Sequence, residues 1–315
     1  MSQTLLRQAR VVDTILSKVV LGYDLNDEFT GHHLFPDVPV PAMGGKIIKF
    51  GKEAFVIRNT KRAPGETVRS IGFSYSDDSY ALENRLLEGK VPEELLTEMQ
   101  KLPNIKAQTE AVNLIMSSMR REGEYDKAQL ATTISHYASD HTQALSGTDM
   151  WDNPASNPEE AISDAKAKIR KSTGRYPNVL HLDIYAYEAL KRHPKIKEHF
   201  RYTGKDSISL DMLATYFDVE KVVAAKALYT PDAESEFTEI WGNNTVLAYV
   251  APPNLRSMRV PSFGYTYVLQ GLPKVEKGYF EHSDRSWHYP VLMADAAVLT
   301  SNHAGFLFTN TAEIK

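Results

Sequence analysis

Hydrophobic residues recur at helical spacing in three stretches of the N-terminal half. Residues 4–21 carry apolar side chains three or four positions apart, which predicts a short amphipathic helix. The acidic, leucine-rich residues 81–102 predict two short helices separated at residues 89–92, where a glycine and a proline interrupt the pattern. Residues 103–122 repeat the helical spacing, and Pro103 suits the first position of a helix of roughly four to five turns.

The second half of the chain changes to short helices and strands. Pro158 opens a helix in which acidic residues come first and basic residues last, as the helix dipole favours, and Gly174 ends it. The apolar run 178–182 predicts a strand, after which Asp183 begins a helix that ends before the His193–Pro194 pair. The pattern then predicts a helix at 211–217 and strands at 219–228, 245–250, 265–270, 275–282, 296–300 and 305–310. Together these elements predict a mixed α+β fold.

Residues 22–45 lack hydrophobic periodicity and include three prolines within six residues. We expect an extended arm that only neighbouring subunits order, since such a segment has too little apolar surface to fold alone. Residues 45–80 then predict two extended strands around the sequence RNTKRAPGET, in which Pro64–Gly65 suits a tight turn. A hairpin of this length is marginal by itself, so we expect it to lie on another subunit.

Charge changes sign within this region. Residues 45–72 contain seven Lys or Arg against two Asp or Glu, whereas residues 73–98 contain seven acidic residues against two basic ones. The whole chain carries a formal net charge of −4, so no overall field attracts nucleic acid. The basic stretch of one copy would neutralise the acidic stretch of a neighbouring copy. The candidate contact residues between subunits are Arg58, Lys61, Arg62, Asp77, Asp78, Glu93 and Glu94.

The sequence lacks the patterns that a known catalytic or metal site requires. It has no cysteine, no phosphate loop, no G-x-S-x-G turn and no H-E-x-x-H pair. His181 and Asp183 have a spacing that some metal ligands share, but Asp183 opens a helix and is better explained as its cap. His136 and His141 would diverge by about 140° on a helix, and His32–His33 lies in the proline-rich arm. We assign no catalytic, cofactor-binding or metal residue; the alternative from another class is a soluble metal-dependent hydrolase.

Four segments follow one another in a recognisable order and spacing: YPNVLHLDIYAYEALKRHPKIKEHFRY, LDMLATYFDVEKVVAAKALY, WGNNTVLAYVAPP and PSFGYTYVL. In these segments the chain resembles the tailed-phage major capsid proteins with the Hong Kong 97-type fold. Within them, Asp183, His193–Pro194, Asp218–Val219 and Trp241–Gly242 stand where the family has its helix start, helix break, strand start and Trp-Gly strand. The N-terminal order of arm, long loop and helix is also similar.

The resemblance implies a domain plan. It comprises an N-terminal arm (1–44), an extended hairpin loop (45–80), a peripheral domain with a long spine helix (81–156), an axial domain (157–275) and strands that return to the peripheral domain (276–315).

The resemblance also implies a structural role and not an enzymatic one. Copies of the chain would form the hexamers and pentamers of an icosahedral shell around packaged double-stranded DNA, bound non-specifically. Only about 44 residues precede the loop, so the expected partners are a separate scaffolding protein and a portal, with a decoration protein left open. We expect no membrane association, assembly in the bacterial host cytoplasm and a final location in the virion. An encapsulin-like compartment that holds cargo enzymes is the alternative within this fold.

Overall fold

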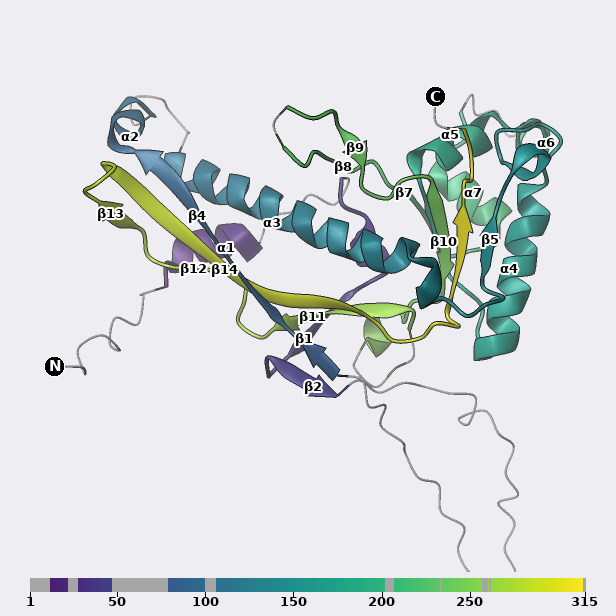
Figure 1. The fold of residues 1–315 in the computed structure, drawn as a ribbon, viewed down its shortest axis with the longest axis horizontal. Helices are drawn as coiled ribbons and strands as arrows, with labels where there is room; N and C mark the ends of the chain where they lie inside the picture. Colours follow the sequence, from purple (N-terminus) through teal and green to yellow (C-terminus); the bar gives the residue numbers. More distant parts are fainter. Residues whose placement is uncertain are drawn as a thin grey trace, which may run out of the picture.

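Two β-sheets and one long helix organise the chain (Figure 1). The computed structural model describes residues 12–21, 28–46, 79–99, 106–201, 207–232, 234–256, 260 and 262–313. A six-stranded sheet runs beside the long helix, and a five-stranded sheet surrounded by shorter helices forms the other end of the molecule. The mixed α+β class predicted from the sequence is therefore confirmed.

The six-stranded sheet is built around one long strand, β14 (Ser286–Leu299). This strand pairs along one edge with a ten-residue antiparallel strand and along the other edge with three shorter strands in turn. The last of these pairs in parallel with a strand from the N-terminal arm. In that order the partners are β4 (Glu83–Pro92), β13 (Tyr279–Glu281), β12 (Lys274–Val275), β11 (Gly264–Leu269) and β1 (Asp37–Val40).

The long helix α3 (Ala107–Thr132) covers one face of this sheet. Side chains alternate across a strand, so Tyr289, Val291 and Met293 of β14 share the face toward α3 and form a buried core with its Met116. The short helix α1 (Thr14–Leu21) packs beside α3 and contributes to the same core. With 26 residues, α3 is longer than the four to five turns predicted, and it begins after Pro103 instead of at it.

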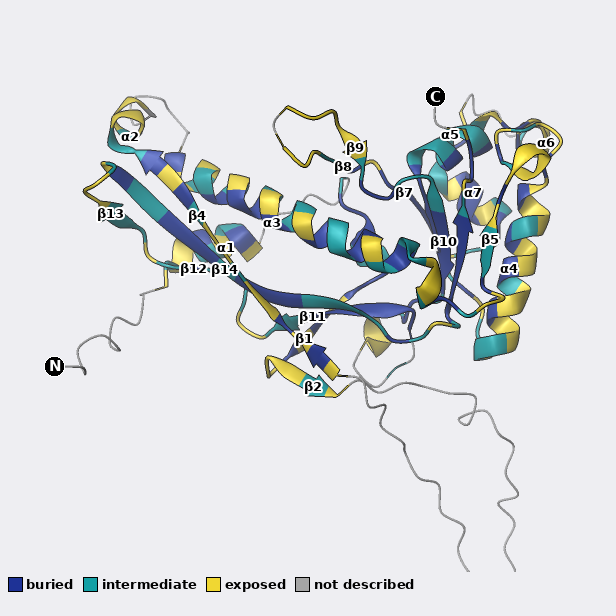
Figure 2. Ribbon diagram, in the orientation of Figure 1, coloured by how far each residue is buried: buried dark blue, intermediate teal, exposed yellow. Residues whose placement is uncertain are grey.

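The five-stranded sheet forms the core of the other end. Its strand order is β5 (Thr142–Ala144), β15 (Gly305–Thr309), β10 (Asn244–Ala248), β6 (Val179–Leu182) and β7 (Lys221–Ala224). All of β6 and most of β10 and β15 are buried, because helices and neighbouring strands cover them (Figure 2). These helices are α4 (Pro158–Thr173), α5 (Ile184–Arg192), α6 (Pro194–His199) and α7 (Leu210–Tyr216).

Local capping signals set the ends of these helices. The Asp183 carboxylate accepts a hydrogen bond from the Ala186 amide at 2.7 Å, which begins α5 as predicted. Gly174 has φ 71°, a left-handed conformation that glycine adopts without steric cost, and it ends α4 at the predicted position. The predicted strand before Asp183 and the break at His193–Pro194 are confirmed as well.

A hydrophobic cluster joins the two ends of the molecule. Phe35 from the arm and Phe263 before β11 pack with Trp241 and with Leu307 of the five-stranded sheet. All four side chains are at most 2% exposed. The C-terminal turns of α3 reach the same cluster through Ala131. The two sheets are therefore held by a common core and not only by the connecting chain.

The prediction of a helix within residues 83–92 is wrong, because this stretch is strand β4. Its backbone pairs with β14 along ten residues, and this pairing outweighs the helical spacing of its leucines. At Gly89 an added Cβ atom would lie 2.9 Å from the Ile115 side chain, so the glycine lets α3 approach the strand closely. Only the second predicted helix forms, as α2 (Glu93–Met99).

The expectation that the N-terminal arm is ordered only by neighbours is wrong for residues 28–40. In this part of the arm, Leu34, Phe35 and Val40 are completely buried within their own subunit. Strand β1 also pairs with β11 along four residues. Proline at position 39 is tolerated because β1 lies at the edge of the sheet.

The predicted hairpin loop has a structured base. Strands β2 (Gly44–Lys46) and β3 (Ser79–Ala81) pair antiparallel, so the chain leaves and returns at neighbouring points. Residues 47–78, which carry the predicted strands and turn, lie outside the described residues.

Two further predictions about strands differ from the structure. The predicted strand 219–228 is split into β7 and β8 (Leu228–Tyr229), which pairs with β9 (Thr238–Glu239). The expected return of all strands after residue 276 to the sheet beside α3 is wrong for β15, which lies in the five-stranded sheet. The described residues also form the 3-10 turns η1 (Gly31–His33), η3 (Ile134–His136), η4 (Gly147–Asp149) and η5 (Pro253–Leu255).

Candidate assembly surfaces

Two of the predicted contact residues lie in the described part of the chain. Glu93 and Glu94 form the first turn of α2, at the end of the molecule farthest from the five-stranded sheet (Figure 1). The Glu93 carboxylate is paired with the Arg285 guanidinium at 2.9 Å, so it already has a partner in its own chain. Glu94 is exposed. The other five, Arg58, Lys61, Arg62, Asp77 and Asp78, lie outside the described residues.

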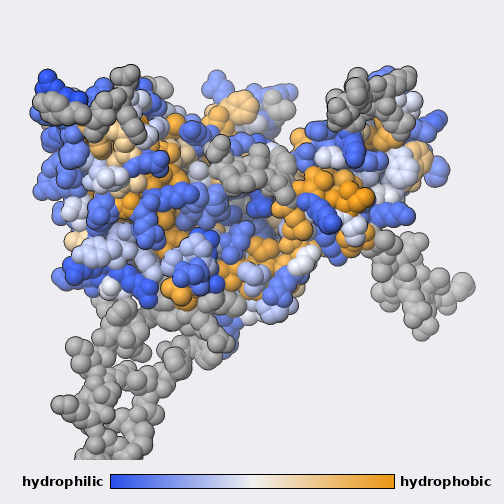
Figure 3. All heavy atoms as spheres, turned by 180° about the vertical axis from the view of Figure 1, so that it is seen from behind, coloured by the Kyte–Doolittle hydropathy of each residue, from blue (hydrophilic) through white to orange (hydrophobic). Residues whose placement is uncertain are grey.

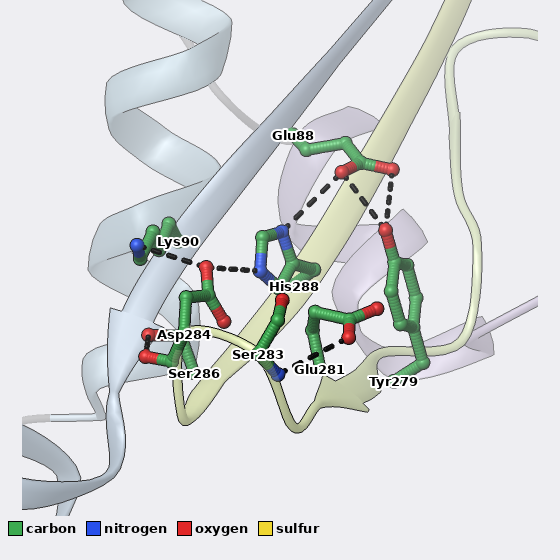
Figure 4. A network of polar contacts seen from close by, with 8 residues as sticks. All are labelled: Glu88, Lys90, Tyr279, Glu281, Ser283, Asp284, Ser286 and His288. Carbon is green, nitrogen blue, oxygen red and sulfur yellow. Dashed lines mark hydrogen bonds and ion pairs between the residues drawn. The ribbon is translucent and has the colours of Figure 1, made fainter.

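A network of polar contacts surrounds the hairpin of β13 and β14 near α2 (Figure 4). His288 has one ring nitrogen 3.3 Å from a Glu88 carboxylate oxygen and the other 3.1 Å from an Asp284 oxygen. Tyr279 donates its hydroxyl to Glu88 at 3.0 Å and stacks on the imidazole. Lys90 lies 2.8 Å from Asp284, and this hydrogen-bonded ammonium lowers the pKa of that carboxyl.

This network locks the hairpin tip onto β4. Its members come from β4, β13, β14 and the turn between the last two, and the Ser283 and Ser286 contacts add bonds within the turn. No single pair is strong when it is this exposed, but a network holds one geometry better than an isolated pair does. Sequence patterns do not predict this network, because Glu88 and His288 are 200 positions apart.

Arg85 joins β4 to α3 and β14 by a second charged cluster. Its side chain is 10% exposed and lies 2.5 Å from carboxylate oxygens of both Glu122 and Asp126 on α3, and 3.1 Å from Asp295 on β14. Asp295 is itself buried; burial raises the pKa of this carboxyl, and the nearby Arg85 opposes the shift. Arg85 therefore holds the helix and the edge strand in register.

Glu124 of α3 connects three parts of the chain in the hydrophobic junction. It is 2% exposed, and its carboxylate accepts hydrogen bonds from the amides of Thr30 at 3.0 Å and Gly31 at 2.8 Å. It also accepts one from the Trp241 indole at 2.7 Å. Burial raises the pKa of Glu124, while neighbouring Lys127 and these donors oppose the rise. This one side chain therefore ties the arm and the five-stranded sheet to α3.

The histidine and aspartate residues considered for metal binding have structural roles. His181 is fully buried and bonded to the Thr30 hydroxyl at 2.8 Å, while Asp183 caps α5 and receives the Thr311 hydroxyl at 2.6 Å. The His136 ring is bonded to a backbone carbonyl, and His141 to the neighbouring Asp140. Within the described residues, no group of three or more His, Asp or Glu side chains is arranged to hold a metal ion.

Apolar side chains are exposed at both ends of the molecule. Viewed from behind, hydrophobic residues gather in patches between hydrophilic ones (Figure 3). In the part of the chain that the structure describes, seven large apolar residues are more than half exposed: Ile15, Leu21, Leu86, Leu114, Ile134, Tyr176 and Phe237. Exposed apolar patches often mark protein contacts. Among the described residues, none of the helices is both long and apolar enough to span a bilayer.

Comparison with known proteins places these features in a family. A model of the family described as phage major capsid protein E matches residues 126–277. The chain is 34% identical over 317 residues to the major capsid protein of Burkholderia phage BcepMu, covering 95% of this chain and 99% of the relative. The chain belongs to the phage major capsid proteins. This capsid protein is also 26% identical to the major capsid protein of Pseudomonas phage JBD67, over 76% of the chain and 77% of the relative.

Solved structures agree with this assignment. A phage-related protein from Bordetella bronchiseptica RB50 is 38% identical and superposes with a TM-score of 0.84, covering 96% of the capsid protein and 99% of that chain. The SrpI encapsulin of Synechococcus elongatus has a TM-score of 0.54 at 13% identity, over 88% of the capsid protein and 85% of the encapsulin. At this identity the encapsulin shares the fold alone. The predicted family and structural role are confirmed.

Proposed function

We propose that this capsid protein forms an icosahedral shell around the packaged double-stranded DNA of a tailed phage. The observation that carries the proposal is the similarity to the BcepMu capsid protein, which extends over 95% of this chain and 99% of the relative. The relative and this chain thus share one subunit plan from end to end. Closure of many copies sums contacts that are individually weak, so the stability of the shell belongs to the lattice.

The two ends of the subunit take different places in the proposed shell. The six-stranded sheet with α3 is the peripheral domain, and the five-stranded sheet with α4 to α7 is the axial domain at capsomer centres. Strands β2 and β3 are the base from which residues 47–78 reach a neighbouring subunit. Their tip, with Arg58, Lys61 and Arg62, then meets acidic residues of that neighbour, among them Asp77, Asp78, Glu93 and Glu94.

Other partners follow from the same proposal. The shell needs a separate scaffolding protein during assembly and a portal through which DNA enters, and both steps take place in the cytoplasm of the bacterial host. The shell encloses DNA without sequence preference, since the chain as a whole is acidic and offers no global basic surface for specific recognition.

Electron microscopy of the overexpressed protein tests shell formation. Closed particles, tubes or capsomer rings support the proposal, whereas a monodisperse monomer at all concentrations and salt conditions contradicts it. Particles isolated from a productive infection should contain DNA that resists nuclease until the shell is opened.

An encapsulin-like compartment is the second candidate, favoured by the similarity of fold to the SrpI encapsulin. The content of native particles distinguishes the two functions. Genome-length DNA supports the capsid, and an enclosed enzyme without DNA supports the compartment. Genes for a portal and a packaging motor beside the gene for this chain would agree with the first outcome.

A further inference from the structure

A β-hairpin projects from the five-stranded end of the subunit. Strands β8 and β9 form its base, and the chain between them rises beyond the body of the molecule (Figure 1). The hairpin is exposed throughout its described length apart from half-buried residues at its base (Figure 2). Phe237, directly before β9, is 74% exposed, although burying an aromatic ring of this size is strongly favourable.

Hydrogen bonds hold the projecting chain in one conformation. The Asp232 carboxylate accepts bonds from the backbone amides of Glu234 at 3.0 Å and Ser235 at 2.7 Å. The hydrogen bond from the Ser235 side chain, followed by these two amide bonds, lowers the pKa of Asp232. At the base, the Tyr229 ring meets the Tyr125 ring of α3 edge-on at 5.0 Å. These contacts hold the described hairpin residues within their own subunit, and such preorganisation lowers the entropy cost of binding.

The charge of the hairpin is entirely negative. Residues 228–239 contain Asp232, Glu234, Glu236 and Glu239 and no Lys, Arg or His. Three of these acidic residues lie within three positions of the exposed Phe237 in the sequence. A partner must therefore offer an apolar contact bordered by positive charge.

Every copy of the chain also carries a hollow with basic and apolar lining residues, which complements the acidic hairpin. It has a volume of about 380 Å³ and opens between α5, α6 and the chain just before α7. Phe200 is half-buried and Ile208 is buried, so both supply apolar lining. Among the described lining residues, four are basic and one, Glu188, is acidic; Glu188 is paired with two of the basic residues, Lys191 and Arg192. The described lining is Glu188, Lys191, Arg192, Lys197, Phe200, Arg201, Ser207 and Ile208.

The hairpin and the hollow lie on different sides of the five-stranded end. In Figure 1 the hairpin projects on the side nearer to α3, whereas α6 lies at the opposite extreme. Two hairpins would repel each other as acidic surfaces, and two hollows would repel each other as basic ones. Contact between unlike surfaces of identical chains is head-to-tail, and such contacts close into rings when the rotation permits.

We propose that the β8–β9 hairpin of one subunit docks in the α5–α6 hollow of the next copy around a capsomer. The proposal rests on the shell-forming function above, which supplies the neighbouring copy. In it, Phe237 packs on the apolar lining of the hollow, and Glu234 and Glu236 face Lys197 and Arg201. Because the charges are at the rim, the contact contributes more to specificity and association rate than to affinity.

Cysteine pairs test the contact directly, because the natural chain has no cysteine. The variant with both Glu236→Cys and Ser207→Cys should, after oxidation of assembled particles, run as a ladder of dimers and higher oligomers on a non-reducing denaturing gel. Each single variant should remain largely monomeric. The matched control joins Glu236→Cys to Asp164→Cys, an exposed position on α4 outside the hollow, and should give no ladder.

Charge reversal provides an independent test. Glu234→Lys with Glu236→Lys, or Lys197→Glu with Arg201→Glu, should lower the association constant of the contact roughly tenfold and reduce particle yield. Combining the two sets should restore the yield, since the complementarity is regained with opposite signs. This rescue separates a direct contact from a general effect on folding.

The outcomes distinguish this proposal from the one on which it rests. If wild-type particles form but the cysteine pair gives no ladder and the reversed variants assemble normally, the docking is wrong and the shell function stands. Absence of particles from the wild-type chain removes both. If reversal of Lys197 and Arg201 leaves shell yield intact but reduces the DNA retained in filled particles, the hollow binds phosphate and the docking proposal is overturned.

Discussion

Replacing Glu124 by leucine should separate the arm and the five-stranded sheet from α3. The substitution Glu124→Leu keeps a side chain of similar length but removes every acceptor for the Thr30 and Gly31 amides and for the Trp241 indole. Three buried N–H groups are then without partners. Lys127, also buried and one turn further along α3, loses its neighbouring carboxylate.

The magnitude follows from counting these donors. An unsatisfied buried donor costs about 1–3 kcal/mol, so three cost ~3–9 kcal/mol. Burial of the leucine side chain returns ~1.5–3 kcal/mol. With central values of ~2 kcal/mol for each donor and ~2 kcal/mol for the leucine, the expected net loss is about 4 kcal/mol. This is a large share of the ~5–15 kcal/mol by which a protein of this kind is stable.

Glu124→Gln is the matched control for this prediction. Its amide oxygen can still accept bonds from the same donors, so we expect a smaller loss, of about 1–2 kcal/mol. Urea unfolding of the unassembled subunit, followed by tryptophan fluorescence, measures both variants. An unfolding free energy for Glu124→Leu within ~0.5 kcal/mol of wild type, the usual range for surface substitutions, would refute the reasoning, and so would equal losses for the two variants.

Four further predictions concern pH, charge and assembly. Burial lowers the pKa of His181 to about 3, so its contribution to stability is present above pH 6.5 and is lost toward pH 3 at about 1.4 kcal/mol per pH unit; His181→Gln should flatten acid unfolding of the subunit, and an unchanged pH profile contradicts this. Arg85→Met leaves its buried carboxylate partner uncompensated and should cost ~2–4 kcal/mol in urea unfolding, with Arg85→Lys losing less. Reversing Lys61 and Arg62 to Glu should leave the subunit folded but impair assembly, and normal assembly at every salt concentration would disprove the loop contact. In limited proteolysis of unassembled subunit, cleavage is expected next to Lys61 and Arg62 but not within residues 28–40, which are mostly buried; equal protection of the loop in subunit and shell argues against an intersubunit role.

Sequence reasoning was most successful where one residue decides a local conformation. Asp183 supplies a side-chain acceptor for a helix start, and Gly174 adopts the left-handed conformation that ends one. Such signals act over three or four residues and need no knowledge of the rest of the chain. The family resemblance extended them, because the order of these local elements is itself informative.

Strand β4 shows where local information was insufficient. Its leucines have helical spacing, yet ten residues pair with β14, which lies about 200 positions later in the chain. The arm is a similar case, since the burial of Phe35 depends on Trp241 and Phe263, which are distant in sequence. Periodicity reports which side chains are apolar, but not which distant strand or cluster will receive them.

By itself, the sequence determined the α+β class, the helix ends at Gly174 and Asp183, the charge inversion between residues 45–72 and 73–98, and the family. Tertiary structure alone decided the buried acceptor Glu124, the clamp at Arg85 and the opposite placement of the acidic hairpin and the basic hollow. Each of these depends on groups that are far apart in the chain, and their distances are set only when the hydrophobic core brings the two sheets together.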